Sequence, residues 1–408
     1  MKRKVSYSVA NFAAKFCNEL GTNKTSICSP LSAEMVLALL ALGCKNQTRE
    51  ELLLLLDVTD DKAIRSSYKY LTSTLKGIKG TTLNLANKVY LKEGGELKPG
   101  IKEDAKKIFQ ASLEQLDFDN KEAAAKTINN WVAQNTNNKI TNIVSPDMFT
   151  ENTRILLVNA IYFQGLWVNK FKVAALGNSS FLVNKTTKIH VPMISSPEEY
   201  FNYGTSQELK AELLQLKYKE SDASMIIVLP DEVEGLKSVL EKLASGHNIM
   251  ADIETMKSTK LVVSIPKFRV ETTIDLKTLL PKLGVKTIFD DKKADINMLK
   301  SNEKLFVSDA IQKALIIVDE NGTEATASTT SNVQIPCCAR SIKRFEASHP
   351  FLYLLTARTI PLFIGIYEGS EYAEVPSERN DLTEYDMALL KRLSEVLNQR
   401  APLGAPSI

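Results

Sequence analysis

Residues 314–336 read ALIIVDENGTEATASTTSNVQIP, and this stretch constrains the fold more than any other. It begins as an apolar strand and reaches a turn signal at Gly322. Residues 323–335 then hold no Pro, no Gly and one charge, with too few large apolar side chains to anchor them in a core. Their Thr, Val and Ile nevertheless favour strands, and nothing breaks a strand before Pro336. We therefore predict an exposed loop with the chemistry of a strand; a Ser/Thr-rich linker is the alternative.

The composition is that of an ordinary globular chain. Of 408 residues, 44% are hydrophobic and 24% are charged, with a net charge of +3. So small a charge without a basic block argues against nucleic-acid binding. No apolar run reaches about 18 residues, so no membrane span is predicted. The basic start lacks the apolar core of a secretory signal. Localisation stays open between the cytoplasm and the extracellular space, reached by another route or after removal of a signal.

The hydrophobic pattern predicts one large α+β domain. Helical patterns dominate the first 150 residues, and strand patterns follow. A capping box at 48–51 predicts a helix start at Thr48. The predicted helices are 31–43, a segment after the capping box, 61–78, 121–137 and 233–244. The predicted strands are 81–92, 154–163, 224–230, 260–272, 314–320, 351–357 and 361–368.

Catalytic and metal-binding patterns are missing from the sequence. The three histidines have no triad or metal spacing, and no P-loop, dinucleotide-binding or GxSxG motif occurs. We therefore expect no enzyme activity, no metal and no cofactor. The cysteines are few and odd in number, which predicts free thiols. Cys337 and Cys338 form a vicinal pair that is either a redox control of the loop or incidental.

Several motifs resemble those of the serpins, in the family's order. VDENGTEATAS (318–328) resembles the hinge of the reactive loop, and LLVNAIYFQGLW (156–167) the central-sheet signature. SPLSAEMVLALLALG (29–43) is similar to the buried helix, and HPFLYLLTARTIPLFIGIY (349–367) to the closing strands. The resemblance covers about residues 5–367. It implies a serpin domain over 1–367 with a reactive loop at about 320–345. Residues 368–408 are a C-terminal extension, either an amphipathic helix or partly disordered.

The resemblance implies a serpin fold of three sheets and about nine helices, a metastable native state and a monomer. In the family, a protease attacks one loop bond and forms an acyl-enzyme. The freed loop inserts into the main sheet, and the trapped protease is distorted. About a dozen inserted residues, at roughly 1 kcal/mol per net hydrogen bond, would supply on the order of 10 kcal/mol. That gain is comparable with the stability of a whole domain.

The hinge favours inhibition over the alternative of a non-inhibitory carrier or chaperone-like protein. Small side chains must slide between strands, and a bulky or Pro-bearing hinge would obstruct them. Here Glu324 is expected to alternate toward solvent on insertion. The hinge residues are Glu320, Gly322, Thr323, Glu324, Ala325, Thr326, Ala327 and Ser328.

The scissile bond stays open between two regions. In the serpins, the reactive residue lies about fourteen positions after the hinge glycine, and that position is Pro336 here. The resemblance therefore places the bond beside Pro336, Cys337 or Cys338, and a shift to Arg340–Ser341 is the alternative. Arg340 would suit a trypsin-like serine protease, whose specificity pocket carries a carboxylate. A cathepsin-like cysteine protease is the other candidate partner, because such enzymes often select an apolar residue before the bond.

Other matched positions imply structural roles. Ser29, Ser32 and Asn159 match the shutter, the polar network beneath the opening sheet. Gln312 stands there in place of a frequent histidine, and Trp167 matches the breach where the loop enters. The basic helix at 61–78 is where some members bind heparin, so a heparin-like polyanion is weakly indicated; a solvated face is the alternative.

Overall fold

Strand β4 (Ile155–Leu166) lies at the centre of a six-stranded sheet, and ten of its twelve residues are buried. Its neighbours are β2 (Thr81–Lys92), which is antiparallel to it, and β12 (Val307–Val318), which is parallel. The strand order is β11-β12-β4-β2-β3, and β13 pairs with β4. The remaining members are β3 (Ser112–Leu116), β11 (Phe268–Asp275) and β13 (Gly322–Thr323).

The computed structural model describes residues 2–301, 303–323 and 342–369, without the side chains of 2–4, 173–178 and 323. Nine α-helices occur in these ranges. No helix among them is both long and apolar enough to span a membrane. The helices are α1 (Lys2–Leu20), α2 (Pro30–Ala41), α3 (Asn46–Leu55), α4 (Asp61–Lys76), α5 (Pro99–Lys107), α6 (Lys121–Asn135), α7 (Leu236–Ala244), α8 (Ile249–Thr255) and α9 (Leu276–Leu279).

The other ten strands are connected in the order β1-β16-β15-β9-β8-β7-β10-β6-β5, with β14 pairing with β10. Strand β10 belongs to two parts of this set. The first half of β10 pairs with β7, whereas Ser264–Pro266 pairs with β6. The two parts correspond to the two smaller sheets expected for the fold, so the predicted α+β class is confirmed. The strands are β1 (Ser26–Cys28), β5 (Lys172–Leu182), β6 (Lys188–Ser195), β7 (Glu199–Ser206), β8 (Ala211–Lys217), β9 (Ala223–Pro230), β10 (Lys257–Pro266), β14 (Arg344–Glu346), β15 (Phe351–Ala357) and β16 (Ile360–Tyr367).

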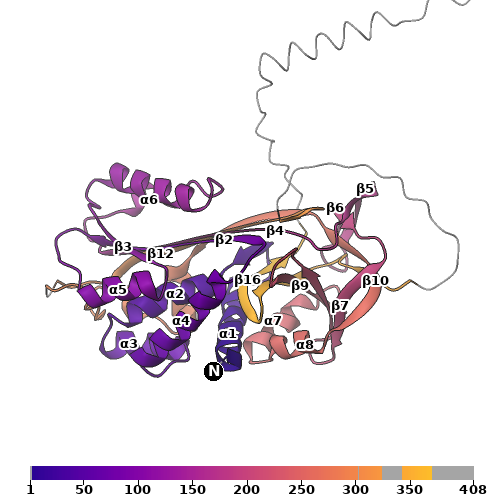
Figure 1. Ribbon diagram of the computed structural model, residues 1–408. Coiled ribbons are helices and arrows are strands. Elements are labelled where there is room, and N and C mark those ends of the chain that lie inside the picture. The colour runs from indigo at the N-terminus through magenta and orange to yellow at the C-terminus, as the bar shows by residue number, and fades with distance from the viewer. Residues whose placement is uncertain (1, 302, 324–341, 370–408) are drawn as a thin grey trace, which may run out of the picture. The chain divides into compact units, whose positions relative to one another are not determined.

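Helices cover the two faces of the central sheet unequally. In Figure 1, α6 lies alone on one face, while α2, α4, α5 and α1 lie on the other. Every residue of α2 is buried, because this helix packs against the sheet and is covered by α1 and α3. Pro30 occupies the first turn and Ser29 caps it, so the helix predicted over 31–43 begins one residue earlier. The central strands β4 and β12 are therefore buried on both faces.

The predicted capping box at Thr48 is wrong. Helix α3 already begins at Asn46, and Lys45 at its N-cap makes no side-chain capping bond. Thr48 Oγ1 accepts instead from the backbone N–H of Asp295 at 3.0 Å. Glu51 accepts from the backbone N–H groups of Lys286 and Thr287, both at 2.8 Å. The side chains of Thr48 and Glu51, which the local pattern assigned to the helix end, therefore bind residues that are distant in the sequence.

Candidate functional site at the opening between β4 and β12

The pairing between β4 and β12 covers only part of each strand. The seam, defined as 155–162 paired with 307–315, ends at the register pair Leu315–Tyr162. Beyond it, 163–165 of β4 pair with β2 on the outer side, 316–318 of β12 pair with β11, and no register pair joins the two segments to each other. The two strands thus separate from each other while each stays bonded to its outer neighbour. We call the region flanked by 163–166 and 316–318 the opening.

The described part of the hinge, together with Asp319 before it, turns back into this opening as residues 319–323. We refer to this described part as the hinge from here on. The Asp319 carboxylate accepts from the backbone N–H groups of Asn321 (2.9 Å) and Gly322 (3.1 Å). Burial raises the pKa of this carboxyl, although the two hydrogen bonds oppose that shift. After the turn, β13 pairs antiparallel with β4, in the register Gly322–Leu166 and Thr323–Gly165. Gly322 and Thr323, which lie within the predicted reactive loop of about 320–345, therefore already form a short strand against β4.

Gly322 is required at this position by the approach of two backbones. Its φ is +150°, a conformation that side chains disfavour. A Cβ atom built on Gly322 would lie 2.1 Å from the carbonyl oxygen of Gly165. Only glycine lets β13 approach β4 this closely.

Trp167 secures the hinge from the end of β4. Its indole N–H donates to the Asp319 carbonyl at 3.0 Å, and its backbone N–H donates to the Asn321 carbonyl at 2.9 Å. The buried indole stacks on Tyr218 with ring centroids 4.5 Å apart. Phe171 adds a backbone bond of 3.0 Å to the Glu320 carbonyl, and Lys267 pairs with the Glu320 carboxylate at 3.0 Å.

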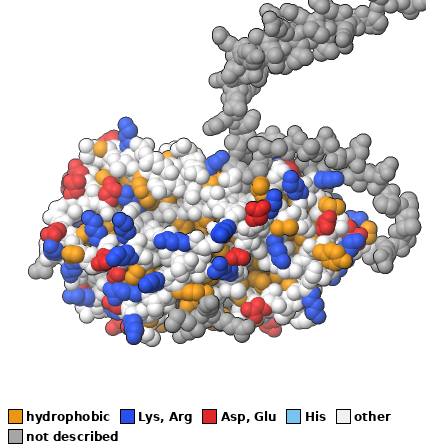
Figure 2. All heavy atoms as spheres, viewed as in Figure 1, with side chains coloured by type: hydrophobic (Ala, Val, Ile, Leu, Met, Phe, Trp, Pro, Cys, Tyr) orange, Lys and Arg blue, Asp and Glu red, His pale blue; other side chains and the backbone are white. Residues whose placement is uncertain are grey.

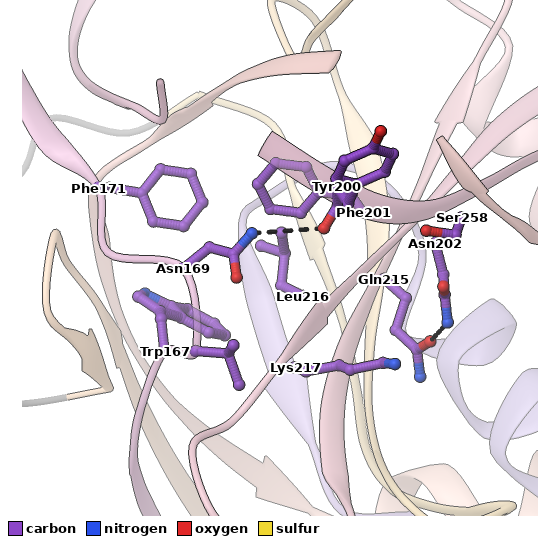
Figure 3. Close-up of a pocket in the computed structure, with 11 residues that line it drawn as sticks. Trp167, Asn169, Phe171, Tyr200, Phe201, Asn202, Gln215, Leu216, Lys217 and Ser258 are labelled. Atoms are coloured by element: carbon purple, nitrogen blue, oxygen red, sulfur yellow. Dashed lines mark hydrogen bonds between the residues drawn. The ribbon is translucent and has the colours of Figure 1, made fainter. Parts of the chain in front are cut away.

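A cavity of about 200 Å³ lies beside Trp167 and Phe171. Figure 3 shows aromatic side chains around it, with Asn169 donating to the Tyr200 carbonyl at 3.4 Å and Asn202 donating to Gln215 at 2.7 Å. Trp167 and Phe171 both line this cavity and both bind the hinge. The segment that holds the hinge is therefore incompletely packed on one side.

A buried polar network crosses the seam beneath the opening. The Gln312 amide donates to the Asn159 side-chain oxygen at 2.8 Å, and these residues are register partners. Gln312 also exchanges hydrogen bonds with the Ser29 backbone, at 2.8 and 2.9 Å. Asn159 in turn donates to Ser32 Oγ at 2.6 Å. The four shutter positions implied by the resemblance are thus brought together.

Asn87 on β2 belongs to the same network and was missed by the sequence analysis. Its side-chain oxygen accepts from Ser32 Oγ at 2.7 Å and from Asn159 at 2.5 Å. It sits on the strand face shared with Leu85 and Val89. A lone asparagine in that otherwise apolar row is the signal that identifies it.

Helix α6 and the segment after it cover the outer face of the seam. The Asn129 side chain accepts from the backbone N–H groups of Ile143 (2.8 Å) and Val144 (3.1 Å) and donates to the Val144 carbonyl (2.9 Å). Lys313 of β12 donates to the Asn142 carbonyl at 2.8 Å. These contacts fix the segment across the strands that flank the seam.

Ten of the predicted positions lie outside the described residues. They are Glu324, Ala325, Thr326, Ala327, Ser328, Pro336, Cys337, Cys338, Arg340 and Ser341. The next described residue is Ile342, and β14, which follows it, pairs parallel with β10. The predicted extension also lies outside the described ranges beyond 369.

The described residues hold no group of His, Cys, Asp and Glu able to bind a metal. His247 pairs with Asp252 at 2.7 Å, and His349 bonds the Pro230 carbonyl at 2.8 Å. Arg65 on the basic helix α4 pairs with Asp104 at 2.9 Å. Figure 2 shows basic and acidic side chains interspersed on the face where α3, α4 and α5 lie.

Comparisons with known proteins agree with this geometry. A family model described as "Serpin (serine protease inhibitor)" matches residues 7–368. Antichymotrypsin-2 of Bombyx mori is 37% identical, covering 88% of this chain and 96% of its own. Human leukocyte elastase inhibitor is 32% identical, covering 80% and 88%. Among solved structures, Serpin48 of Tenebrio molitor superposes with a TM-score of 0.80 at 31% identity, covering 91% and 99%.

A thyroxine-binding globulin in complex with thyroxine has the same TM-score of 0.80 at 26% identity, covering 90% of this chain and 99% of its own. The shared fold therefore includes both protease inhibitors and a thyroxine-binding protein. The family match, the relatives and the opening between β4 and β12 lead to one conclusion: the chain belongs to the serpin family, the serine protease inhibitors.

Proposed function

We propose that the chain inhibits proteases as a suicide substrate, with the loop after Thr323 as the bait. The protease cleaves one loop bond and forms an acyl-enzyme through its own nucleophile. The freed loop then continues β13 downward between β4 and β12. The observation that carries the proposal is the antiparallel pairing of Gly322 and Thr323 with the end of β4.

The strand directions favour such an insertion. β4 and β12 are parallel neighbours, whereas each is antiparallel to its outer partner. A strand that continues β13 would be antiparallel to both, so it would replace a parallel pairing by two antiparallel ones. Antiparallel pairing is slightly more stable per residue. The direction of β13 is therefore already the one that the inserted strand needs.

Insertion must break contacts that close the seam. The hydrogen bond between Gln312 and Asn159 spans the two strands that have to separate. The segment held by Asn129 must lift from the outer face. These contacts keep the uncleaved sheet closed, and the new strand replaces them with about a dozen net hydrogen bonds, worth roughly 1 kcal/mol each.

We propose serine proteases as the target class, because the named relatives include an antichymotrypsin and an elastase inhibitor. The scissile bond is assigned either to Arg340–Ser341, for a trypsin-like enzyme, or beside Pro336, Cys337 or Cys338. A cathepsin-like cysteine protease remains the second target class. We further propose that residues 1–367 form the inhibitory domain and that 368–408 are an extension outside it.

The experiment is a complex assay with trypsin and, separately, a cathepsin-L-like enzyme. A band that survives denaturing electrophoresis near the sum of the protease mass and the 45.3 kDa chain would support trapping. Mass spectrometry of the released C-terminal peptide gives the bond. Trypsin with its active serine blocked is the control and should form no band. Loop cleavage without a complex across a wider protease panel would contradict the proposal and favour the carrier alternative.

Two substitutions separate the candidate bonds. Arg340→Ala should abolish the complex with trypsin if the bond is Arg340–Ser341, because the pocket carboxylate loses its partner. A double Cys337→Ser, Cys338→Ser variant should leave that complex intact. The opposite pattern would place the bond beside the cysteine pair.

A further inference from the structure

A second cavity, of about 140 Å³, lies among α1, α2, α4 and the segment after α3. Apolar atoms make up the larger part of its surface, with Val5, Val9, Leu56, Val58, Ala63 and Leu71 as the apolar residues, and Ser8, Thr59 and Ser67 add hydroxyl groups. An engineered apolar cavity of roughly 150 Å³ is known to hold benzene. The cavity therefore has room for one ring or a short branched chain.

Two buried polar side chains line this apolar cavity. Glu34 is 2% exposed and Tyr68 is 3% exposed. Neither makes a side-chain hydrogen bond or an ion pair with another side chain that the structure describes. Buried polar groups nearly always have partners. The oxygens of Glu34 and Tyr68 are not among the fully enclosed unpartnered atoms of the described residues, so they are reached from the cavity, where a partner can lie.

The titratable residues that line the cavity favour a positively charged ligand. Glu34 and the exposed Asp57 are carboxyl groups, and Tyr68 is the other titratable group. No Lys, Arg or His occurs among the described lining residues. Burial alone raises the pKa of Glu34 to about 8, so this carboxyl is mostly protonated at neutral pH without a cation beside it. A cation placed beside Glu34 would favour the charged carboxylate.

We propose that this cavity binds a small organic amine, with the ammonium paired to Glu34 and the apolar body against the Val and Leu side chains. Tyr68 supplies a second oxygen to the ammonium. This site is separate from the hinge and the seam, and it does not depend on protease inhibition.

Benzylamine is the probe, and benzyl alcohol is its uncharged counterpart of similar size. Binding of the amine ionises Glu34 and releases close to one proton. The affinity of the full chain for benzylamine should therefore rise about tenfold between pH 6 and pH 7, measured by titration calorimetry. Calorimetry in buffers of different ionisation enthalpy counts the released proton directly. Benzyl alcohol should bind more weakly and without this pH dependence.

Three variants make the test specific. Glu34→Gln keeps the shape, so it should lose at least about tenfold in benzylamine affinity at pH 7.5 and retain benzyl alcohol binding. Ala63→Leu narrows the cavity and should weaken both ligands. Glu50→Gln changes an exposed carboxyl that does not line the cavity, and it should behave as the unaltered chain.

Equal, pH-independent affinities for benzylamine and benzyl alcohol would overturn the proposal. So would a Glu34→Gln variant that binds benzylamine as tightly as the unaltered chain. Failure of the unaltered chain to bind benzylamine would also overturn it and leave a cavity filled by water.

Discussion

The side-chain amide of Gln312 donates a hydrogen bond of 2.8 Å to the side-chain oxygen of Asn159, across the seam between two parallel strands. Both residues are buried, and neither side chain titrates. The same Gln312 amide group exchanges hydrogen bonds with the Ser29 backbone at the start of α2. This arrangement locks the seam without any group that responds to pH.

The first prediction is that seam opening is independent of pH between 5.5 and 8. Gln312→His should introduce a dependence, with faster opening at low pH. A neutral imidazole can accept from the Ser29 N–H, whereas a protonated one cannot. Stopped-flow fluorescence after loop cleavage measures the rate. The chain has two tryptophans, so Trp131→Phe leaves Trp167 as the reporter of the hinge. A rate that varies with pH in the parent and not in Gln312→His would contradict the account.

Gly322→Ala should impair the hinge selectively. The added Cβ would clash with the Gly165 carbonyl, and φ at +150° adds backbone strain. Because β13 can no longer pair, insertion should slow, and more chain should be cleaved for each complex formed. We expect the stoichiometry of inhibition, read from titration of a trapped protease, to rise several-fold. Gly100→Ala is the matched control, since its added Cβ meets nothing within 4 Å. Equal stoichiometries of inhibition for Gly322→Ala and Gly100→Ala would show that pairing of β13 with β4 does not contribute to insertion.

Asn129→Ala should loosen the segment that covers the seam. The side chain satisfies two backbone N–H groups and one carbonyl, and its loss leaves them without partners. We expect a loss of about 1–3 kcal/mol of native stability together with faster insertion after cleavage. Urea denaturation and the fluorescence assay give the two quantities. Asn130→Ala, an exposed position of the same helix, should change neither. Lower stability without faster insertion would show that the segment does not restrain the seam.

Glu34 should make native stability fall as pH rises. Its pKa is about 8 when folded against 4.5 as the ordinary value, so the folded chain keeps a proton that the unfolded chain has lost. Between these values this group lowers stability by about 1.4 kcal/mol per pH unit, and above pH 8 its effect levels off. In Glu34→Gln this contribution disappears, so the variant should gain stability relative to the parent as pH rises from 5.5 to 8. Urea midpoints at several pH values measure it. If the stability difference between Glu34→Gln and the parent stayed constant from pH 5.5 to 8, the Glu34 carboxyl would have an ordinary pKa and would be in contact with water.

Helices and strands could be predicted well from the sequence where one pattern dominated. The alternation over 81–92 matches β2 in both bounds, and the helix predicted over 31–43 overlaps α2. The prediction failed where distant segments bind the same side chain. Thr48 and Glu51 resemble a capping box, yet they bond residues about 240 positions away. No local pattern contains that information.

The site was predictable to a similar degree. The shutter and breach positions followed from a resemblance, but the contacts of Trp167 with Asp319 and Asn321 did not, because they depend on how a turn folds back. The role of Asn87 in the polar network was not predicted, because a single polar residue in a strand pattern has many possible causes. The separation of β4 from β12 beyond Tyr162 also leaves no local trace, since both strands remain apolar to their ends.

The most direct test of the account is hydrogen exchange in the native and loop-cleaved chains, followed by mass spectrometry. In the uncleaved chain, 316–318 and the start of 163–166 have no pairing across the opening, and only Gly165 and Leu166 pair there, with the two residues of β13. If the cleaved loop inserts between β4 and β12, peptides from both segments should exchange at least about tenfold more slowly after cleavage, because new ladder bonds protect them. Unchanged or faster exchange in these segments, after complete cleavage of the loop, would contradict the account.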